Sequence, residues 1–383
     1  MQYRPEIDGL RALAVIPVVL FHAGIAGFSG GFVGVDIFFV ISGYLITSII
    51  LNEQQKDSFT LAGFYERRAR RILPALMLVV LLSAVAAWYL LLPAELVDFG
   101  ESLASVGVFA SNILFWTQSD YFATTSEFIP LLHTWSLAVE EQFYLIFPVF
   151  MIFTLAWTKT KRLSVLTIVA ILSLIFCEWA WRNAPEANFF LAPSRVWELM
   201  AGVLCAFYLQ QARDPKLLIR QLASVAGLLM LVYSIAFLDK SIPFPSLFAL
   251  IPVVGTVLII LFTDKNTLVG KILSLPFIVG VGLISYSAYL WHQPLFVFAR
   301  LNSMDELSVT TLLGLSILAF IMAFISWRWV EKPFRNRNWL SQRQVLWMAA
   351  LCSLILISLG LIFVLGGGFD ERFVTLENSI ATI

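Results

Sequence analysis

Long runs of apolar residues, separated by short polar or basic segments, form the main pattern along this chain. A helix needs about 20 consecutive apolar residues to cross a bilayer, because each residue adds ~1.5 Å toward a hydrocarbon core of ~30 Å. Eleven runs have about this length, near 10–26, 32–51, 72–92, 136–157, 162–181, 193–210, 221–238, 246–262, 276–298, 308–330 and 345–366. The pattern predicts an all-α, polytopic membrane protein with about eleven transmembrane helices.

The polar segments between these runs predict the orientation, because Lys and Arg concentrate in cytoplasmic loops. With the N-terminus inside, most of the 25 Lys and Arg residues fall on the inner side. We therefore expect a cytoplasmic N-terminus and a periplasmic C-terminus. The half-apolar stretch 99–118 is interpreted as a surface or re-entrant helix at the outer face, since a further crossing would move the later basic loops outside.

Composition extends the membrane assignment to the whole chain. The 383 residues are 60% hydrophobic and 13% charged, whereas soluble domains are about 45–50% apolar and about 25% charged. The formal net charge of zero gives no indication of a nucleic-acid partner. The three cysteines lie in apolar runs at unrelated spacing, so we expect buried thiols and no metal site.

Ionisable side chains inside the predicted spans are the candidate chemistry. Each costs about 2.5–3.5 kcal/mol at the centre of a membrane helix, and such residues usually face a bundle interior or a wet cavity. His133 and Glu140 are seven residues apart, so they share a helix face but are separated by about 10.5 Å of rise. One layer in the outer half of the membrane is predicted to contain His22, Asp36, His133, Glu140, Arg195, Glu198 and His292.

Arginines gather at the opposite, inner side. The run RRARR occupies 67–71, while Arg11 and Arg328 lie inside predicted spans, where topology alone requires no charge. The guanidinium group binds phosphate through two parallel hydrogen bonds. An anionic, phosphate-bearing cosubstrate entering from the inside would explain this placement, although basic inner loops also serve as topology signals.

Several stretches together identify a family resemblance: YRPEIDGLRALAVIPVVLFH, GGFVGVDIFFVISGYLI, FYERRARRILPAL, HTWSLAVEEQFY, SRVWELMAG, ISYSAYLWHQP and EKPFR. In this order they resemble the acyltransferase family 3 membrane proteins. The resemblance implies transfer of an acyl group, commonly acetyl from cytoplasmic acetyl-CoA, to a sugar hydroxyl on the outer side of a bacterial cytoplasmic (inner) membrane. Acceptors in this family include lipopolysaccharide O-antigen and peptidoglycan.

The resemblance also suggests roles for residues. The family's arginine-to-histidine pattern maps onto Arg11 and His22, and its paired arginines map onto RRARR in two registers, 67 with 70 or 68 with 71. Its essential glutamate maps onto Glu140 or Glu141, of which helix geometry favours Glu140. Candidate catalytic residues are His22, Asp36, Glu140 and His133. Candidate donor-binding residues are Arg11, Arg67, Arg68, Arg70, Arg71 and Arg328. Candidate acceptor-binding or oxyanion-stabilising residues are Arg195, Glu198, His292 and Tyr286.

Two questions about mechanism stay open at this level. An imidazole at position 22 can act as a general base toward the sugar hydroxyl, or it can attack the thioester and carry the acyl group. A nearby carboxylate, Asp36 or Glu140, could orient it. Buried acids, histidines and arginines would also suit a proton-coupled transporter of a small polar solute, which is the alternative function.

The predicted organisation is an acyltransferase-like membrane domain over 1–335, followed by an additional span near 345–366 and a short periplasmic tail within 336–383. In relatives of this kind an SGNH-type esterase-like domain often follows such a span, and no GDS-type block follows here. The expected partners are therefore acyl-CoA, a glycan or lipid-linked glycan acceptor, the bilayer and an SGNH-type domain that is missing from this chain.

Overall fold

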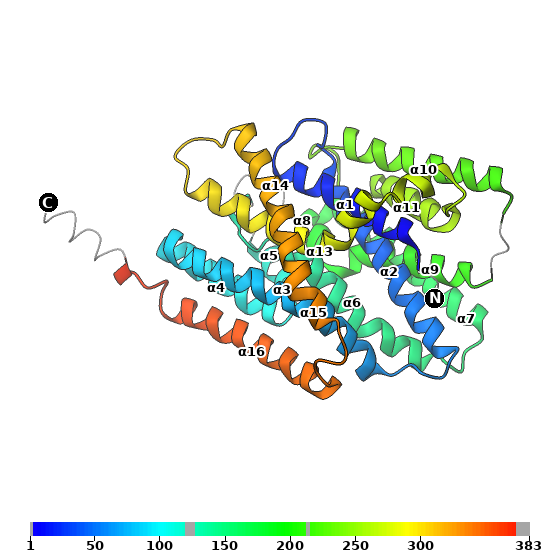
Figure 1. Cartoon of the computed structure of the whole chain (residues 1–383), viewed down its shortest axis with the longest axis horizontal. Coiled ribbons are helices and arrows are strands. Elements are labelled where there is room, and N and C mark those ends of the chain that lie inside the picture. Colours follow the sequence, from blue (N-terminus) through cyan, green and yellow to red (C-terminus); the bar gives the residue numbers. More distant parts are fainter. Residues whose placement is uncertain (1–2, 119–126, 212–214, 373–383) are drawn as a thin grey trace, which may run out of the picture.

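The computed structural model describes residues 3–118, 127–211 and 215–372 of the chain, and within them every regular element is a helix (Figure 1). Each of the eleven apolar runs forms one main helix. These helices are α1 (Pro5–His22), α2 (Gly34–Gln54), α3 (Leu61–Leu90), α6 (Thr134–Phe153), α7 (Lys159–Asn183), α9 (Ala192–Leu209), α10 (Leu217–Phe237), α11 (Leu250–Phe262), α13 (Pro276–Leu301), α14 (Val309–Ser326) and α16 (Gln342–Leu365). The prediction of an all-α polytopic membrane protein is confirmed.

Length and apolar composition qualify eight helical segments of the described residues as candidate membrane spans. The other three expected spans lie on α1, on α13 and on a shorter apolar helix over Leu247–Phe262. Short elements join the long helices: η1 (Gly31–Val33), α8 (Pro185–Phe190), η3 (Leu247–Ala249), α12 (Leu268–Leu273), the π-helical turn η4 (Trp327–Glu331) and α15 (Lys332–Phe334).

The half-apolar stretch 99–118 falls on a helical hairpin. Helix α4 (Pro93–Gly107) has 15 residues and α5 (Ser111–Gln118) has eight, so α4 spans only ~22 Å, less than the hydrocarbon core. Phe109 turns the chain between them with a positive φ of 52°, and the Gln118 amide donates to the Glu101 carboxylate. Both ends of the hairpin therefore lie at the same end of the bundle, which agrees with the re-entrant interpretation.

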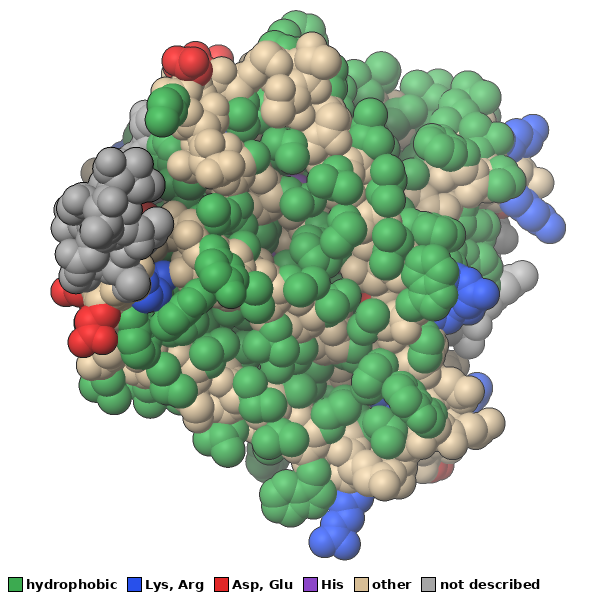
Figure 2. Space-filling view, turned by 60° about the vertical axis from the view of Figure 1, so that its left-hand side comes forward, with side chains coloured by type: hydrophobic (Ala, Val, Ile, Leu, Met, Phe, Trp, Pro, Cys, Tyr) green, Lys and Arg blue, Asp and Glu red, His purple; other side chains and the backbone are tan. Residues whose placement is uncertain are grey.

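Central and peripheral helices differ in burial. The apolar windows of α2 and α3 are 72% and 61% buried, whereas those of α7, α14 and α16 are only 22%, 22% and 17% buried. On the face drawn in Figure 2, apolar side chains are spread over most of the surface, and the Lys, Arg, Asp and Glu side chains lie mainly near its edges. An apolar surface of this extent suits lipid rather than water, so the protein is a multi-pass membrane protein whose polar residues gather among its central helices.

Glycines allow the central helices to approach closely. A Cβ on Gly202 of α9 would lie 2.0 Å from the Val40 carbonyl oxygen of α2, and one on Gly34 of α2 would lie 2.3 Å from the Ala14 carbonyl oxygen of α1. Such contacts require residues without a side chain. Helix α2 is thereby held against both α1 and α9, which positions the polar side chains described below.

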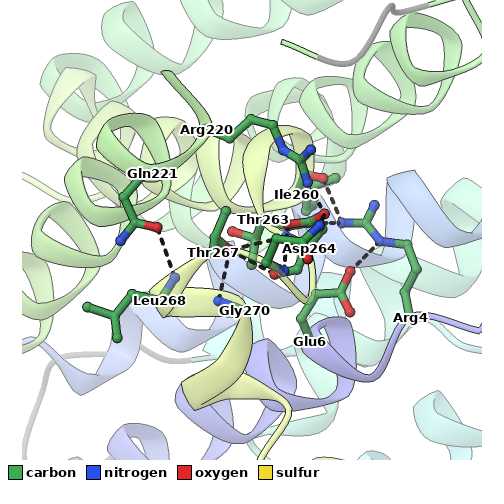
Figure 3. A network of polar contacts seen from close by, with 11 residues as sticks. Arg4, Glu6, Arg220, Gln221, Ile260, Thr263, Asp264, Thr267, Leu268 and Gly270 are labelled. Atoms are coloured by element: carbon green, nitrogen blue, oxygen red, sulfur yellow. Dashed lines mark hydrogen bonds and ion pairs between the residues drawn. The ribbon is translucent and has the colours of Figure 1, made fainter. Parts of the chain in front are cut away.

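A polar network fixes the loops near one end of α1 (Figure 3). Arg4 donates to Glu6 (2.7 Å), to the Tyr44 hydroxyl (2.9 Å) and to the Ile260 carbonyl (2.9 Å). Arg220 pairs with Asp264 in the loop after α11. Burial alone would raise the pKa of Asp264, but the hydrogen bonds from Arg220 and Asn266 and the charge of Arg220 together outweigh it and lower that pKa.

Candidate functional site

A cavity of about 90 Å³ lies among α1, α2, α3, α6 and α13. Its volume corresponds to roughly three water molecules at ~30 Å³ each. The polar side chains that line it are Arg11, Ser42, Arg68, Arg71, Ser136, Glu140, Tyr144, Ser285, Tyr286 and Tyr289. Helices distant in sequence thus bring three arginines and one glutamate to a single enclosed space. We call the end of the bundle that holds these arginines the arginine end.

The three cavity arginines differ in their partners. Arg11 pairs with Asp8 at 3.3 Å on its own helix. Arg68 pairs with Glu141 at 3.2 Å, and its guanidinium lies 3.9 Å from the centre of the Tyr144 ring. Within the described residues, Arg71 has no ion pair or hydrogen bond. An enclosed and unpaired guanidinium is costly, so this cavity is suited to an anion.

The structure distinguishes the two registers of RRARR. Arg68 and Arg71 are three residues apart, share a face of α3 and line the cavity. Arg67 instead pairs with Glu53 at 2.7 Å. Arg70 binds Glu66 and the carbonyl oxygens of residues 334 and 336. Arg67 and Arg70 therefore hold the fold together at this end and do not face the cavity.

Arg328 is not brought to the cavity either. It lies on the π-helical turn η4 with an exposed side chain, two residues after Ser326, the last buried residue of α14. The charged pair that the turn places at the arginine end is Glu331 with Arg335, whose Oε2 and Nη2 atoms are 2.6 Å apart. This pair was missed because basic residues that follow a span are expected from topology alone.

Glu140 is bound inside the cavity as a hydrogen-bond acceptor. The Ser42 hydroxyl donates to its Oε1 at 2.8 Å and the Tyr144 hydroxyl to its Oε2 at 3.2 Å. The neighbouring Glu141 accepts from Arg68 instead. The helix geometry that favoured Glu140 as the inward-facing acid of the two therefore agrees with the structure.

All three histidines meet at the other end of this central region, which we call the histidine end. The ring of His292 lies 5.0 Å from that of His22 and 5.5 Å from that of His133. His133 and His292 are buried, and His22 is partly buried. The predicted common layer of histidines is present, built from α1, the residue preceding α6, and α13. Within the described residues, no group of three His, Cys, Asp or Glu could hold a metal ion.

Backbone carbonyls select the tautomers of two imidazoles. His22 Nδ1 lies 2.9 Å from the Val18 carbonyl oxygen, and His292 Nδ1 lies 2.6 Å from that of Tyr289. Because a carbonyl can only accept, each Nδ1 must carry the proton, which leaves the lone pair on Nε2. Neutral His22 and His292 are therefore set up as bases through Nε2.

Tyr289 lies at the boundary between the cavity and the histidines. Its side chain lines the cavity, while its ring is 5.6 Å from that of His133 and 5.3 Å from that of His292. Its hydroxyl donates to the His133 carbonyl at 2.9 Å and lies 2.7 Å from the Ser136 hydroxyl. None of the three histidines lines the cavity itself. Tyr289 was missed, although it is three residues from both Tyr286 and His292.

The remaining candidates form a separate buried cluster. Arg195 of α9 pairs with Asp36 of α2 and with Glu198, each at 3.2 Å, and all three side chains are at most 1% exposed. Asp36 therefore engages a guanidinium rather than an imidazole. Arg195 and Glu198 do not line the cavity, and Tyr286, expected at the acceptor, lines it near the arginines. The structure thus divides the predicted outer layer into a histidine cluster and this ion-pair cluster.

Comparison with known proteins assigns the family. The family model described as an acyltransferase domain matches residues 4–328. The chain belongs to acyltransferase family 3. The match covers all five cavity helices and the histidine cluster, and it ends before Arg335 and α16.

Three relatives illustrate the family. O-acetyltransferase OatA of Staphylococcus aureus strain MRSA252 is 32% identical over 392 residues, or 96% of this chain and 64% of the relative. SAR0937 of the same strain, provisionally an O-acetyltransferase, is 33% identical over 387 residues, 94% of this chain and 64% of the relative. Peptidoglycan O-acetyltransferase OatA of Listeria monocytogenes is 31% identical over 356 residues, 89% of this chain and 57% of the relative.

The chain thus spans about 57–64% of the length of these relatives. No solved structure matches the chain.

Proposed function

We propose that this chain is a transmembrane O-acyltransferase that moves an acyl group, acetyl first among candidates, from acyl-CoA to a hydroxyl of a cell-surface glycan. The observation that carries the proposal is the guanidinium of Arg71, which has no ion pair within the described part of the chain and lines a cavity together with Arg11 and Arg68. Phosphates of a coenzyme A thioester would supply the missing negative charge. Membership of the acyltransferase family and the names of the relatives support the reaction type.

In this proposal the donor extends from the arginine end toward the histidine end. Arg11 and His22 are eleven residues apart on α1, which is about 16.5 Å and close to three full turns, so both lie on one helix face. The pantetheine arm has a similar length, roughly 15–20 Å at backbone-like bond spacing. The cavity ends at Tyr289 and Ser136, so the side chain of Tyr289 must move when the thioester reaches the imidazoles.

The transfer step uses His22 as general base. Its Nε2 takes the proton of the acceptor hydroxyl as the oxygen attacks the thioester carbonyl carbon. The carbon–sulfur bond then breaks, and the sulfur leaves as the thiol after receiving that proton. The ring of His292 lies 5.0 Å from that of His22, and the ring of His133 lies 5.5 Å from that of His292. Both imidazoles stabilise charge that develops in this step. Glu140 holds the cavity wall through Ser42 and Tyr144.

For the acceptor we propose a surface glycan, with peptidoglycan ahead of lipopolysaccharide O-antigen because the Listeria relative is named for peptidoglycan. The proposed location is the bacterial cytoplasmic membrane, with the arginine end facing the cytoplasm, where acyl-CoA is made. The basic loops at that end support this orientation. An SGNH-type domain outside this chain remains part of the proposal as a partner for the final transfer.

Acyl-CoA consumption tests the function. Purified protein in lipid nanodiscs is given acetyl-CoA and a glycan fragment, and release of free thiol and acetylation of the glycan are measured. We expect thiol release and glycan ester formation by wild type, and neither by His22→Ala. Solute uptake into proteoliposomes without any thiol release would favour the transporter and refute the enzyme.

A further inference from the structure

The segment that follows α14 forms a strap, residues 331–340, across the arginine end of the cavity. Arg70, which is 3% exposed, donates to the carbonyl oxygens of Phe334 (3.1 Å), Asn336 (3.2 Å) and Leu340. One guanidinium thus binds three carbonyl oxygens of the strap. Because Arg70 adjoins the cavity residue Arg71 on α3, this clamp fixes the strap beside the cavity.

The strap is attached at its start as well. Glu331 is fully buried and accepts a hydrogen bond from Ser287 of α13. Ser287 directly follows the cavity residues Ser285 and Tyr286 in the chain. Glu331 also binds Arg335 at 2.6 Å. Two independent contacts, one to α3 and one to α13, therefore hold the strap that carries Arg335 against two of the helices that line the cavity.

Arg335 adds a fourth positive charge to the arginine cluster. It acts electrostatically on both Arg11 and Arg71. Four carboxylates accompany the four guanidinium groups. Those of Asp8, Glu141 and Glu331 are each paired with one guanidinium, and the fourth is that of the cavity residue Glu140. Glu140 accepts hydrogen bonds from Ser42 and Tyr144. Within the described residues the guanidinium of Arg71 has no ion pair, and a phosphate group would supply one.

The exposed fractions of these arginine side chains indicate how close each lies to solvent. The side chain of Arg335 is 36% exposed, whereas those of Arg11 and Arg68 are 10% and 13% exposed. Arg335 is thus the most exposed of these three arginines. The part of a coenzyme A thioester that stays nearest solvent while its acyl end points inward is the nucleotide with its phosphates.

Building on the proposed function, we propose that Arg335 is a specificity residue that binds phosphate groups at the nucleotide end of the donor and favours coenzyme A thioesters over thioesters that lack a nucleotide. Glu331 orients this side chain as a positioning residue. The deeper arginines then hold the donor nearer its pantetheine end.

Binding by variants of the full chain tests this role. Affinities for coenzyme A and for pantetheine, the same arm without nucleotide or phosphates, are measured by calorimetry in nanodiscs for wild type and Arg335→Ala. We expect coenzyme A to bind Arg335→Ala about tenfold more weakly or worse, the loss of one charge-assisted hydrogen bond. The affinity for pantetheine should change less than twofold.

Two further variants separate charge from folding. Arg337→Ala removes an exposed arginine of the same strap and should bind coenzyme A as wild type does. The pair Glu331→Gln with Arg335→Gln removes both charges together, so it avoids leaving a buried carboxylate unpaired, and it should show the same selective loss.

The outcomes distinguish the two levels of the proposal. If wild type binds coenzyme A and both Arg335 variants bind it equally well, the role of Arg335 is refuted while the proposed function stands. Equal loss of coenzyme A and pantetheine binding would also refute it, because that result indicates general damage to the site. Absence of coenzyme A binding by wild type would overturn the proposed function itself.

Discussion

Arg71 is expected to lower the stability of the protein without bound coenzyme A and to be required for the binding of coenzyme A. Within the described residues it has no ion pair, and it faces a cavity shared with Arg11 and Arg68. Replacement by methionine keeps much of the side-chain length and removes the charge. The perturbation therefore tests directly whether the cavity is built for an anion.

The magnitudes follow from burial and charge. Insertion of an arginine at membrane depth costs about 2.5–3.5 kcal/mol, and replacing buried charges by apolar side chains can stabilise a protein by about 1–4 kcal/mol. We expect Arg71→Met to raise the stability of the empty protein by ~2 kcal/mol. A hydrogen bond to a charged group contributes about 1.5–3 kcal/mol, so binding of coenzyme A should weaken about 10- to 150-fold.

The assay is thermal unfolding in detergent, followed by fluorescence of the 12 tryptophans, combined with calorimetric titration of coenzyme A. Arg68→Met is the matched control, because it removes the same charge from the same cavity but leaves the enclosed Glu141 without its partner. This control should lose stability as well as binding. An Arg71→Met protein that is less stable than wild type, or that binds coenzyme A normally, would refute the reasoning.

Three further variants test other parts of the account. His22→Ala should abolish acyl transfer while membrane insertion and unfolding temperature stay near wild type; acetylation of the glycan at the normal rate would contradict its role as base. Gly202→Ala places a Cβ 2.0 Å from a carbonyl oxygen of α2 and should lower the unfolding temperature. Its control, Gly314→Ala, has no atom within 4 Å of the new Cβ and should be neutral or stabilising by up to ~1 kcal/mol. Equal effects of the two substitutions would disprove the close packing of α2 and α9. Asp36→Ala removes one partner of the buried Arg195 and should cost about 3–5 kcal/mol, and an unchanged unfolding temperature would show that the pair contributes nothing.

The helices were predictable from the sequence because the bilayer imposes a length and an apolar composition on each span. The meeting of the histidines was predictable for the same reason. Depth along a span can be counted in residues, so His22, His133 and His292 could be assigned to one layer before any contact was known. The re-entrant hairpin α4–α5 followed from loop charge, which limited the number of crossings.

The neighbours of a residue within its layer could not be predicted by counting residues along a span. Asp36 and Arg195 share the depth of the histidines, but the close approach of α2 and α9 at Gly202 directs them toward each other. Arg328 is exposed because it lies two residues after the buried Ser326, and a span that is apolar on all sides does not reveal which of its faces is buried. The role of Tyr289 as a cavity residue could not be predicted, because it depends on how α13 packs against α6, which is a property of the tertiary structure.

The most direct test of the central claim is the side of the membrane on which the donor is consumed. Thiol release is measured with acetyl-CoA added to sealed inside-out vesicles, which expose the cytoplasmic face, and to right-side-out vesicles, each containing wild type or His22→Ala. The account predicts release only by wild type in inside-out vesicles. Release in right-side-out vesicles alone, or release by His22→Ala at the wild-type rate, would contradict it.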